Sequence, residues 1–262
     1  MSGISHMLLG SSVAGDFKFV QSFSVSAQTN LPRGVFLDSS GLRMYVGART
    51  TERLLQYSLS TAWDISTASY VRQLTVSSQI SSVSNLFFKP DGTSLFILDN
   101  TSPGEIAKYD LSTAWDISSA TYSSSLAVTA FPLGLFFKPD GTKVYVTTAQ
   151  TDEVIQYDLD SAWGTTSSSN SSFSLASESS TPYGTLFNST GTKMYMWSAT
   201  RFLFEYDVAT AWDVTTASYT GRTILDDSAD GLTAVASFMN SSTTLFYTVY
   251  GANPGAVRQF SR

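Results

Sequence analysis

Short apolar runs, separated by turn-forming residues, follow one another along the whole chain. The run Leu135-Phe136-Phe137 leads into the turn Pro139-Asp140-Gly141, and a second run, Val144-Tyr145-Val146, follows. Because glycine supplies the positive φ of a tight hairpin, such a pair of runs predicts two antiparallel strands. Both strands are nearly all apolar, which is typical of strands covered on both faces.

Two further runs complete each unit. Residues 155–159 alternate apolar and polar side chains, which predicts a half-buried third strand. A loop containing tryptophan follows, and after it residues such as 122–128 predict a fourth strand. Each unit therefore contains four short strands and no helical periodicity.

The unit recurs five times. Its turn positions 41, 92, 141, 191 and 242 are separated by 49 to 51 residues, and four units carry a tryptophan six residues after a tyrosine. The tryptophans are Trp63, Trp115, Trp163 and Trp212. Four strands in each repeat of this length predict an all-β, five-bladed β-propeller with four antiparallel strands per blade. A closed β-solenoid or a β-sandwich is the alternative.

The N-terminal strand is expected to close the ring. The fifth unit stops after its third strand, whereas Phe19, Phe23 and Val25 reproduce the spacing of the fourth strands. Strand 17–26 should therefore pair with strand 255–261, which removes the open edge of an incomplete blade. This assigns residues 17–262 to one propeller domain and residues 1–16 to an N-terminal tail.

Composition narrows the function. The net charge of −6 and the 15 scattered Lys and Arg argue against nucleic acid and anionic membranes as partners. No apolar run is long enough for a transmembrane helix, so membrane insertion is not expected. Cysteine is absent, which excludes disulfides, thiolate metal sites and a cysteine nucleophile.

Few residues are candidates for chemistry. His6, the only histidine, lies in the tail, so the propeller cannot hold a Ser-His-Asp triad. Most aspartates occupy repeated turn positions, and the loop trio Asp226, Asp227 and Asp230 matches no known calcium loop. We therefore expect no catalytic residue, no metal, no cofactor and no enzymatic activity. A lactonase- or glycosidase-like enzyme using loop carboxylates is the competing hypothesis.

The inner mouth of the ring is the candidate ligand site. The first strands begin at Arg33, Ser84, Leu133, Tyr183 and Ala234, which share no chemistry. This argues against a lectin with one sugar site per blade. It leaves one asymmetric site, formed by Arg33 and Tyr183 with Arg49 or Arg201. The repeated tryptophans are interpreted as plugs that pack each loop onto its blade, although an indole can also stack against a sugar.

Two sequence segments carry a family resemblance. Residues Pro132–Thr148 resemble the repeat of the YVTN and NHL class of β-propellers, and the Trp repeat of Tyr109–Tyr122 is similar to propellers encoded by bacteriophages, especially marine ones. The chain departs from this repeat at Ser58, where the other Trp repeats have Asp, and at Gly164, where they have Asp after Trp. Both departures are expected to affect turns only. The resemblance implies a structural or interaction protein of the virion, either tail-associated or decorating the capsid, and assembled in the bacterial cytoplasm.

The implied partners are other virion proteins, further copies of this chain and host-surface glycans. A host-surface glycan-binding adhesin is the alternative to a purely structural role. The tail contains one apolar cluster, Met7, Leu8 and Leu9, flanked by Ser and Gly. This cluster is too small to fold alone, and we expect it to dock against another virion protein or a neighbouring copy.

Overall fold

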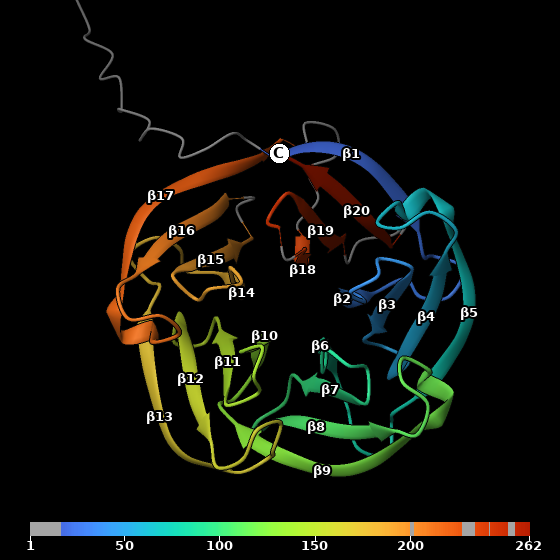
Figure 1. Ribbon diagram of the computed structural model, residues 1–262, viewed down its shortest axis with the longest axis horizontal. Coiled ribbons are helices and arrows are strands. Elements are labelled where there is room, and N and C mark those ends of the chain that lie inside the picture. Colours follow the sequence, from blue (N-terminus) through green and yellow to red (C-terminus); the bar gives the residue numbers. More distant parts are fainter. Residues whose placement is uncertain (1–16, 200–201, 227–233, 241, 251–254) are drawn as a thin grey trace, which may run out of the picture.

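The computed structural model describes residues 17–199, 202–226, 234–240, 242–250 and 255–262. Within these ranges, twenty strands form five four-stranded blades around a central axis (Figure 1). The prediction of an all-β, five-bladed propeller is confirmed. Arg201, Asp227, Asp230 and the tail with His6 and its apolar cluster lie outside the described residues.

Each blade runs from an inner strand to an outer strand. Blade 1 comprises β2 (Pro32–Leu37), β3 (Arg43–Ala48), β4 (Arg53–Leu59) and β5 (Ala68–Thr75). Blade 2 comprises β6 (Val83–Phe88), β7 (Ser94–Asp99), β8 (Gly104–Leu111) and β9 (Ala120–Val128). Blade 3 comprises β10 (Pro132–Phe137), β11 (Lys143–Thr148), β12 (Glu153–Leu159) and β13 (Ser167–Ser174). Blade 4 comprises β14 (Pro182–Phe187), β15 (Lys193–Ser198), β16 (Phe202–Val208) and β17 (Ala217–Asp226).

Blade 5 is assembled from both ends of the chain. It comprises β18 (Ala234–Met239), β19 (Leu245–Tyr250), β20 (Ala256–Ser261) and, outermost, β1 (Phe17–Ser24). β1 pairs antiparallel with β20, from Lys18 opposite Ser261 to Ser24 opposite Ala256, so the predicted closure is confirmed. β1 also meets β17 in a short parallel pairing at Phe17, which joins blades 4 and 5 into one eight-stranded sheet.

The core consists of five apolar layers, one between each pair of neighbouring blades. Between blades 1 and 2, for example, Tyr45 packs on Phe88 with ring centroids 4.3 Å apart. Inner strands are thus covered on both faces, as their apolar sequences predict. Because each fully buried side chain stabilises the fold by roughly 1.5–3 kcal/mol, the layers supply most of the cohesion of the ring.

The third strands are more buried than their alternating sequence predicts. Four equivalent polar side chains on these strands are at most 7% exposed: Gln56, Gln156, Glu205 and Gln259. Gln56 shows the reason, because its side-chain amide donates to the Trp115 carbonyl at 3.3 Å and accepts from the Ile117 N–H at 3.4 Å in the next blade. The polar face is buried because it binds the neighbouring blade's backbone.

A tyrosine of the second strand reinforces this link at three interfaces. Its hydroxyl donates to the carbonyl of the next blade's tryptophan at 2.6–2.8 Å. The pairs are Tyr45 with Trp115, Tyr145 with Trp212, and Tyr247 with Trp63. Each accepting loop continues into a short 3₁₀ helix, η1 (Ile65–Thr67), η2 (Ile117–Ser119) or η3 (Val214–Thr216), capped by an aspartate.

The interface between blades 4 and 5 is joined by an ion pair in place of the hydrogen bond from a tyrosine. Blade 5 takes its outer strand from the N-terminus, so it has no tryptophan loop to accept such bonds. In that place Arg262 donates through Nη2 to Oε1 of Glu205 at 2.7 Å, and its guanidinium lies 4.6 Å from the Phe17 ring centroid. Because the Glu205 side chain is only 4% exposed, the pair is a buried ionic contact.

Arg262→Ala should destabilise the fold by about 3 kcal/mol, because it leaves the Glu205 carboxylate buried without its cation. Adding Glu205→Gln should recover most of that loss, since the neutral amide needs no counter-charge. Urea denaturation of the single and double variants measures both effects. Arg72→Ala, which removes an exposed pair with Asp116, is the control and should cost under about 1 kcal/mol. If Arg262→Ala costs as much in the presence of Glu205→Gln as in its absence, the assignment is contradicted.

Candidate functional site

The hairpins between first and second strands are built around tryptophan. In each of the first four blades the indole lies against the hairpin glycine, and a Cβ on Gly92 would fall 2.4 Å from the Trp115 ring. Gly92 also has φ of 74°, and its carbonyl accepts from the Trp115 N–H at 3.0 Å. Glycine is therefore required twice over, for its φ and for the indole above it. The structure agrees with the plug interpretation.

The tryptophan also reaches the preceding blade. The Trp115 ring lies 5.4 Å from Phe88 of its own blade and 6.4 Å from Phe36 of blade 1, centroid to centroid. Among the described residues the Trp115 indole N–H forms no hydrogen bond to a backbone acceptor. The ring therefore acts through packing, and its backbone carries the polar contact.

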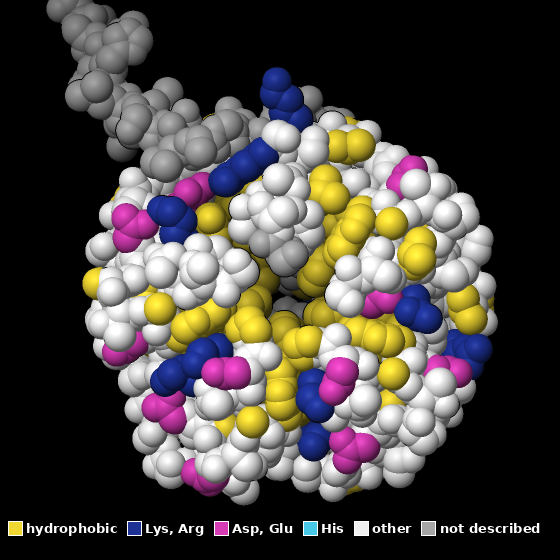
Figure 2. Space-filling view, in the orientation of Figure 1, with side chains coloured by type: hydrophobic (Ala, Val, Ile, Leu, Met, Phe, Trp, Pro, Cys, Tyr) yellow, Lys and Arg dark blue, Asp and Glu magenta, His cyan; other side chains and the backbone are white. Residues whose placement is uncertain are grey.

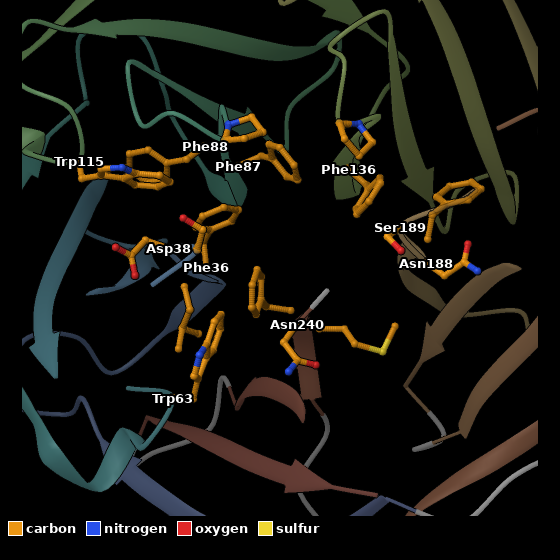
Figure 3. Close-up of a pocket in the computed structure, with 17 residues that line it drawn as sticks. Phe36, Asp38, Trp63, Phe87, Phe88, Trp115, Phe136, Asn188, Ser189 and Asn240 are labelled. Carbon is orange, nitrogen blue, oxygen red and sulfur yellow. The ribbon is translucent and has the colours of Figure 1, made fainter. Parts of the chain in front are cut away.

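Phenylalanines from the ends of the inner strands surround the axis. They are Phe36, Phe87, Phe136 and Phe238, with Leu186 at the fifth equivalent position. Successive rings lie 5.2–5.6 Å apart, from Phe238 through Phe36 and Phe87 to Phe136. We call these four rings the phenylalanine arc, and Figure 3 shows three of them bordering the axis. Beneath the arc the channel narrows to a cavity of about 30 Å³.

Above the arc, on the hairpin face, lies a pocket of about 250 Å³. We call it the axial pocket. Its lining consists of the arc, Leu37, Phe88, Phe187, Met239, the two indoles Trp63 and Trp115, Pro90, Pro139, and the polar residues Asp38, Ser39, Asn188, Ser189 and Asn240. Figure 2 shows hydrophobic side chains gathered around this central hollow. An aromatic floor with a partly polar rim is the usual composition of a small-ligand site.

Two rim hydroxyls are available to a ligand. Asp38 already forms hydrogen bonds within its own hairpin: its carboxylate accepts from Arg43 Nη1 at 2.9 Å and from the Leu42 N–H at 3.0 Å. Ser39 and Ser189 are exposed, and within the described part of the chain their hydroxyls form no hydrogen bond. The axial pocket therefore offers apolar contact from below and hydroxyl groups at its edge.

The residues predicted from the sequence lie at the other end of the inner strands. Arg33, Arg49 and Tyr183 line no part of the axial pocket. Arg33 and Arg49 lie on neighbouring strand ends, since Arg33 pairs with Gly47 and the Arg49 N–H donates to the Leu31 carbonyl at 3.1 Å. Burial lowers the pKa of Arg33 and the charge of Arg49 lowers it further, while Tyr183 raises it. The strand register places Val235, in place of Ala234, at the position equivalent to Arg33.

The repeated carboxylates have structural roles. Burial alone would raise the pKa of Asp91, but hydrogen bonds from Lys89 and from the side chain and backbone of Thr93 lower it to about 2. Asp140 has the same environment and also a pKa of about 2. Both are ionised at neutral pH and cannot act as general acids there. Among the described residues no group of three His, Cys, Asp or Glu is placed to hold a metal.

Sequence reasoning missed the axial pocket. Its signal was the pair of apolar residues before each hairpin, such as Phe36-Leu37 and Phe87-Phe88. In a strand, adjacent side chains point to opposite faces. The two members of such a pair therefore pack into two different layers, Phe36 between blades 1 and 2 and Leu37 between blades 5 and 1, and both also line the pocket.

Comparison with known proteins identifies the fold. Neither a protein-family model nor a curated protein matches the sequence. A protein of unknown function from Desulfotomaculum acetoxidans DSM 771 matches 83% of the chain with a TM-score of 0.54 and 10% identity. This chain spans only 62% of that protein. A luciferin-regenerating enzyme matches 92% of the chain and 95% of its own, with a TM-score of 0.54 and 11% identity. These identities show the fold alone.

One prediction needs correction on this evidence. The expectation that the chain is not an enzyme is contradicted by the comparison to this extent: a solved structure of the same fold that matches nearly the whole chain is described as an enzyme. The expectation depended on the lack of a histidine and a cysteine in the propeller. The lack of these two residue types does not exclude catalysis by this fold.

The sequence also predicted no transmembrane helix. Within the part of the chain that the structure describes, no helix has the length and apolar character needed to span a membrane.

Trp115→Ala should lower the free energy of unfolding by about 3 kcal/mol, because it empties the space above Gly92 and beside Phe88. Trp163→Ala is the matched control, since Trp163 has the same contacts in blade 3 but does not line the axial pocket. Chemical denaturation should show similar losses for both. Unchanged stability in either variant would refute the plug interpretation.

Proposed function

We propose that this protein is a saccharide-binding propeller of a bacteriophage particle, and that the axial pocket is its binding site. The observation that carries the binding proposal is the aromatic floor of the pocket beneath two available hydroxyls. The virion assignment is supported by the similarity of the Trp repeat to phage-encoded propellers, not by the structure.

The chemistry of the pocket suits a sugar ring. The C–H face of a pyranose packs against aromatic rings, and its hydroxyls can pair with Ser39 and Ser189 at the rim. Pockets for drug-sized ligands hold roughly 300–1,000 Å³. At about 250 Å³ the axial pocket fits a single ring. Because the phenylalanine arc narrows the channel below, the ligand enters from the hairpin face and ends there, which favours the terminal residue of a glycan.

The proposed setting is the surface of the virion, after assembly in the bacterial cytoplasm. Other virion proteins would hold the propeller through its tail, leaving the hairpin face directed toward host-surface glycans. A rigid ring closed by β1 suits this task, because the aromatic floor is preorganised and little conformational entropy is lost on binding.

Ser189→Trp should reduce glycan binding at least about tenfold, because the indole would fill the pocket from an exposed rim position. Thr190→Trp is the matched control, since Thr190 is exposed in the same hairpin but does not line the pocket. The measurement is binding to an array of bacterial surface glycans, followed by calorimetry with the strongest ligand. Both variants should melt within about 2 °C of the parent protein.

Two results would overturn this proposal. Glycan binding that is equal in the two variants would place the site elsewhere. Turnover of the arrayed glycans or of a lactone panel by the parent protein, lost in Ser189→Trp, would replace binding by catalysis and fit the similarity to an enzyme.

Replacing Met7, Leu8 and Leu9 by Ser should abolish incorporation into particles, because the tail would lose its only apolar cluster. The melting temperature should stay within about 2 °C, since these residues belong to no repeat. Quantification of the protein in purified particles measures the effect, with Ser2, Ser11 and Ser12 replaced by Ala as the control. A normal copy number of the apolar-to-Ser variant would move docking from the tail to the propeller.

A further inference from the structure

Two arginines of blade 1 lie at the mouth of the channel opposite the axial pocket. Arg33 is the second residue of β2 and pairs with Gly47, while Arg49 directly follows β3. Both residues therefore lie at the end of blade 1 that carries the loops between blades. Tyr183 occupies the position on β14 equivalent to Arg33 and packs against the apolar layer between blades 5 and 1.

The two guanidinium groups have few partners. The single hydrogen bond of the Arg33 side chain within the described residues goes from Nη1 to the Pro32 carbonyl at 3.2 Å. Arg49 donates to Ser82 Oγ at 2.9 Å and to Asn100 Oδ1 at 3.3 Å, both neutral acceptors. Across the described ranges no carboxylate lies within 4 Å of either group. Several donors of Arg33 thus have no acceptor.

This arrangement contrasts with the hairpin face. There the basic side chains are neutralised by carboxylates, as in Lys89 with Asp91 and Lys138 with Asp140. At the loop mouth burial removes water from Arg33, and the positive charge of Arg49 adds to the cost of keeping Arg33 charged. A partly buried pair of like charges is stabilised by a bound counter-ion, and the fork of an arginine suits an anion with two oxygens.

We propose that Arg33 and Arg49 form an oxyanion-binding site at the loop mouth, which takes a carboxylate or a phosphate group. The Tyr183 hydroxyl supplies a further donor from the facing blade. The site is separate from the axial pocket, because the phenylalanine arc lies between them, and it does not depend on the saccharide proposal.

Thermal melts of the full chain in sodium chloride at constant ionic strength test the site. Inorganic phosphate, glucuronate and neutral glucose are the probes. The parent protein should gain about 3 °C at saturating phosphate or glucuronate and nothing with glucose. Arg49→Gln should melt higher than the parent protein without anion, since the repulsion is relieved, and should gain nothing from either anion.

Arg33→Gln is a second variant with the same expectation, in case Arg49→Gln misfolds. Arg72→Gln, on the outer strand β5, changes charge equally and should keep the parent response. A gain with glucuronate alone would identify a carboxylate ligand, and a gain with phosphate alone a phosphate ligand. No gain with either, or an equal gain in Arg49→Gln, would overturn the proposal.

Discussion

The whole ring depends on covering both faces of the inner strands. These strands are apolar on both sides, so a single blade leaves two hydrophobic faces exposed and gains a core only between neighbours. Five such layers therefore require a closed circle, because an open one would leave two faces in water. β1 completes blade 5 for this reason, and its Phe17 packs into the last layer beside Phe246, with ring centroids 5.5 Å apart.

The polar links between blades, made by a tyrosine and a glutamine, are present or absent together. The tyrosine and glutamine links bind one and the same loop of the next blade, so each is useful only while that loop keeps its shape. At the interface of blades 2 and 3, Phe96 and Lys108 replace the tyrosine and glutamine, and the accepting loop carries Gly164 and no 3₁₀ helix. The three changes fall on one interface, as expected if the links act as a unit.

Much of this fold was predictable because repeated residues act within their own blade. Hairpin glycines, loop tryptophans and strand spacing reveal their roles locally, and the spacing of Phe19, Phe23 and Val25 was enough to predict closure. The burial of Gln56 and the pairing of Glu205 with Arg262 were not predictable, since both depend on a neighbouring blade. The axial pocket was missed for the same reason: its floor exists only where five strand ends meet.

The two ends of the channel differ because their charges are balanced differently. On the hairpin face, the residue types that form the turns also neutralise the basic side chains, so the axial pocket presents aromatic carbon and hydroxyls. At the loop mouth, Arg33 has no counterpart among Ser84, Leu133, Tyr183 and Val235, and within the described residues no carboxylate neutralises its charge. A five-fold scaffold therefore carries a site without five-fold symmetry, because the residues at the loop mouth, unlike the phenylalanines of the arc, differ from blade to blade.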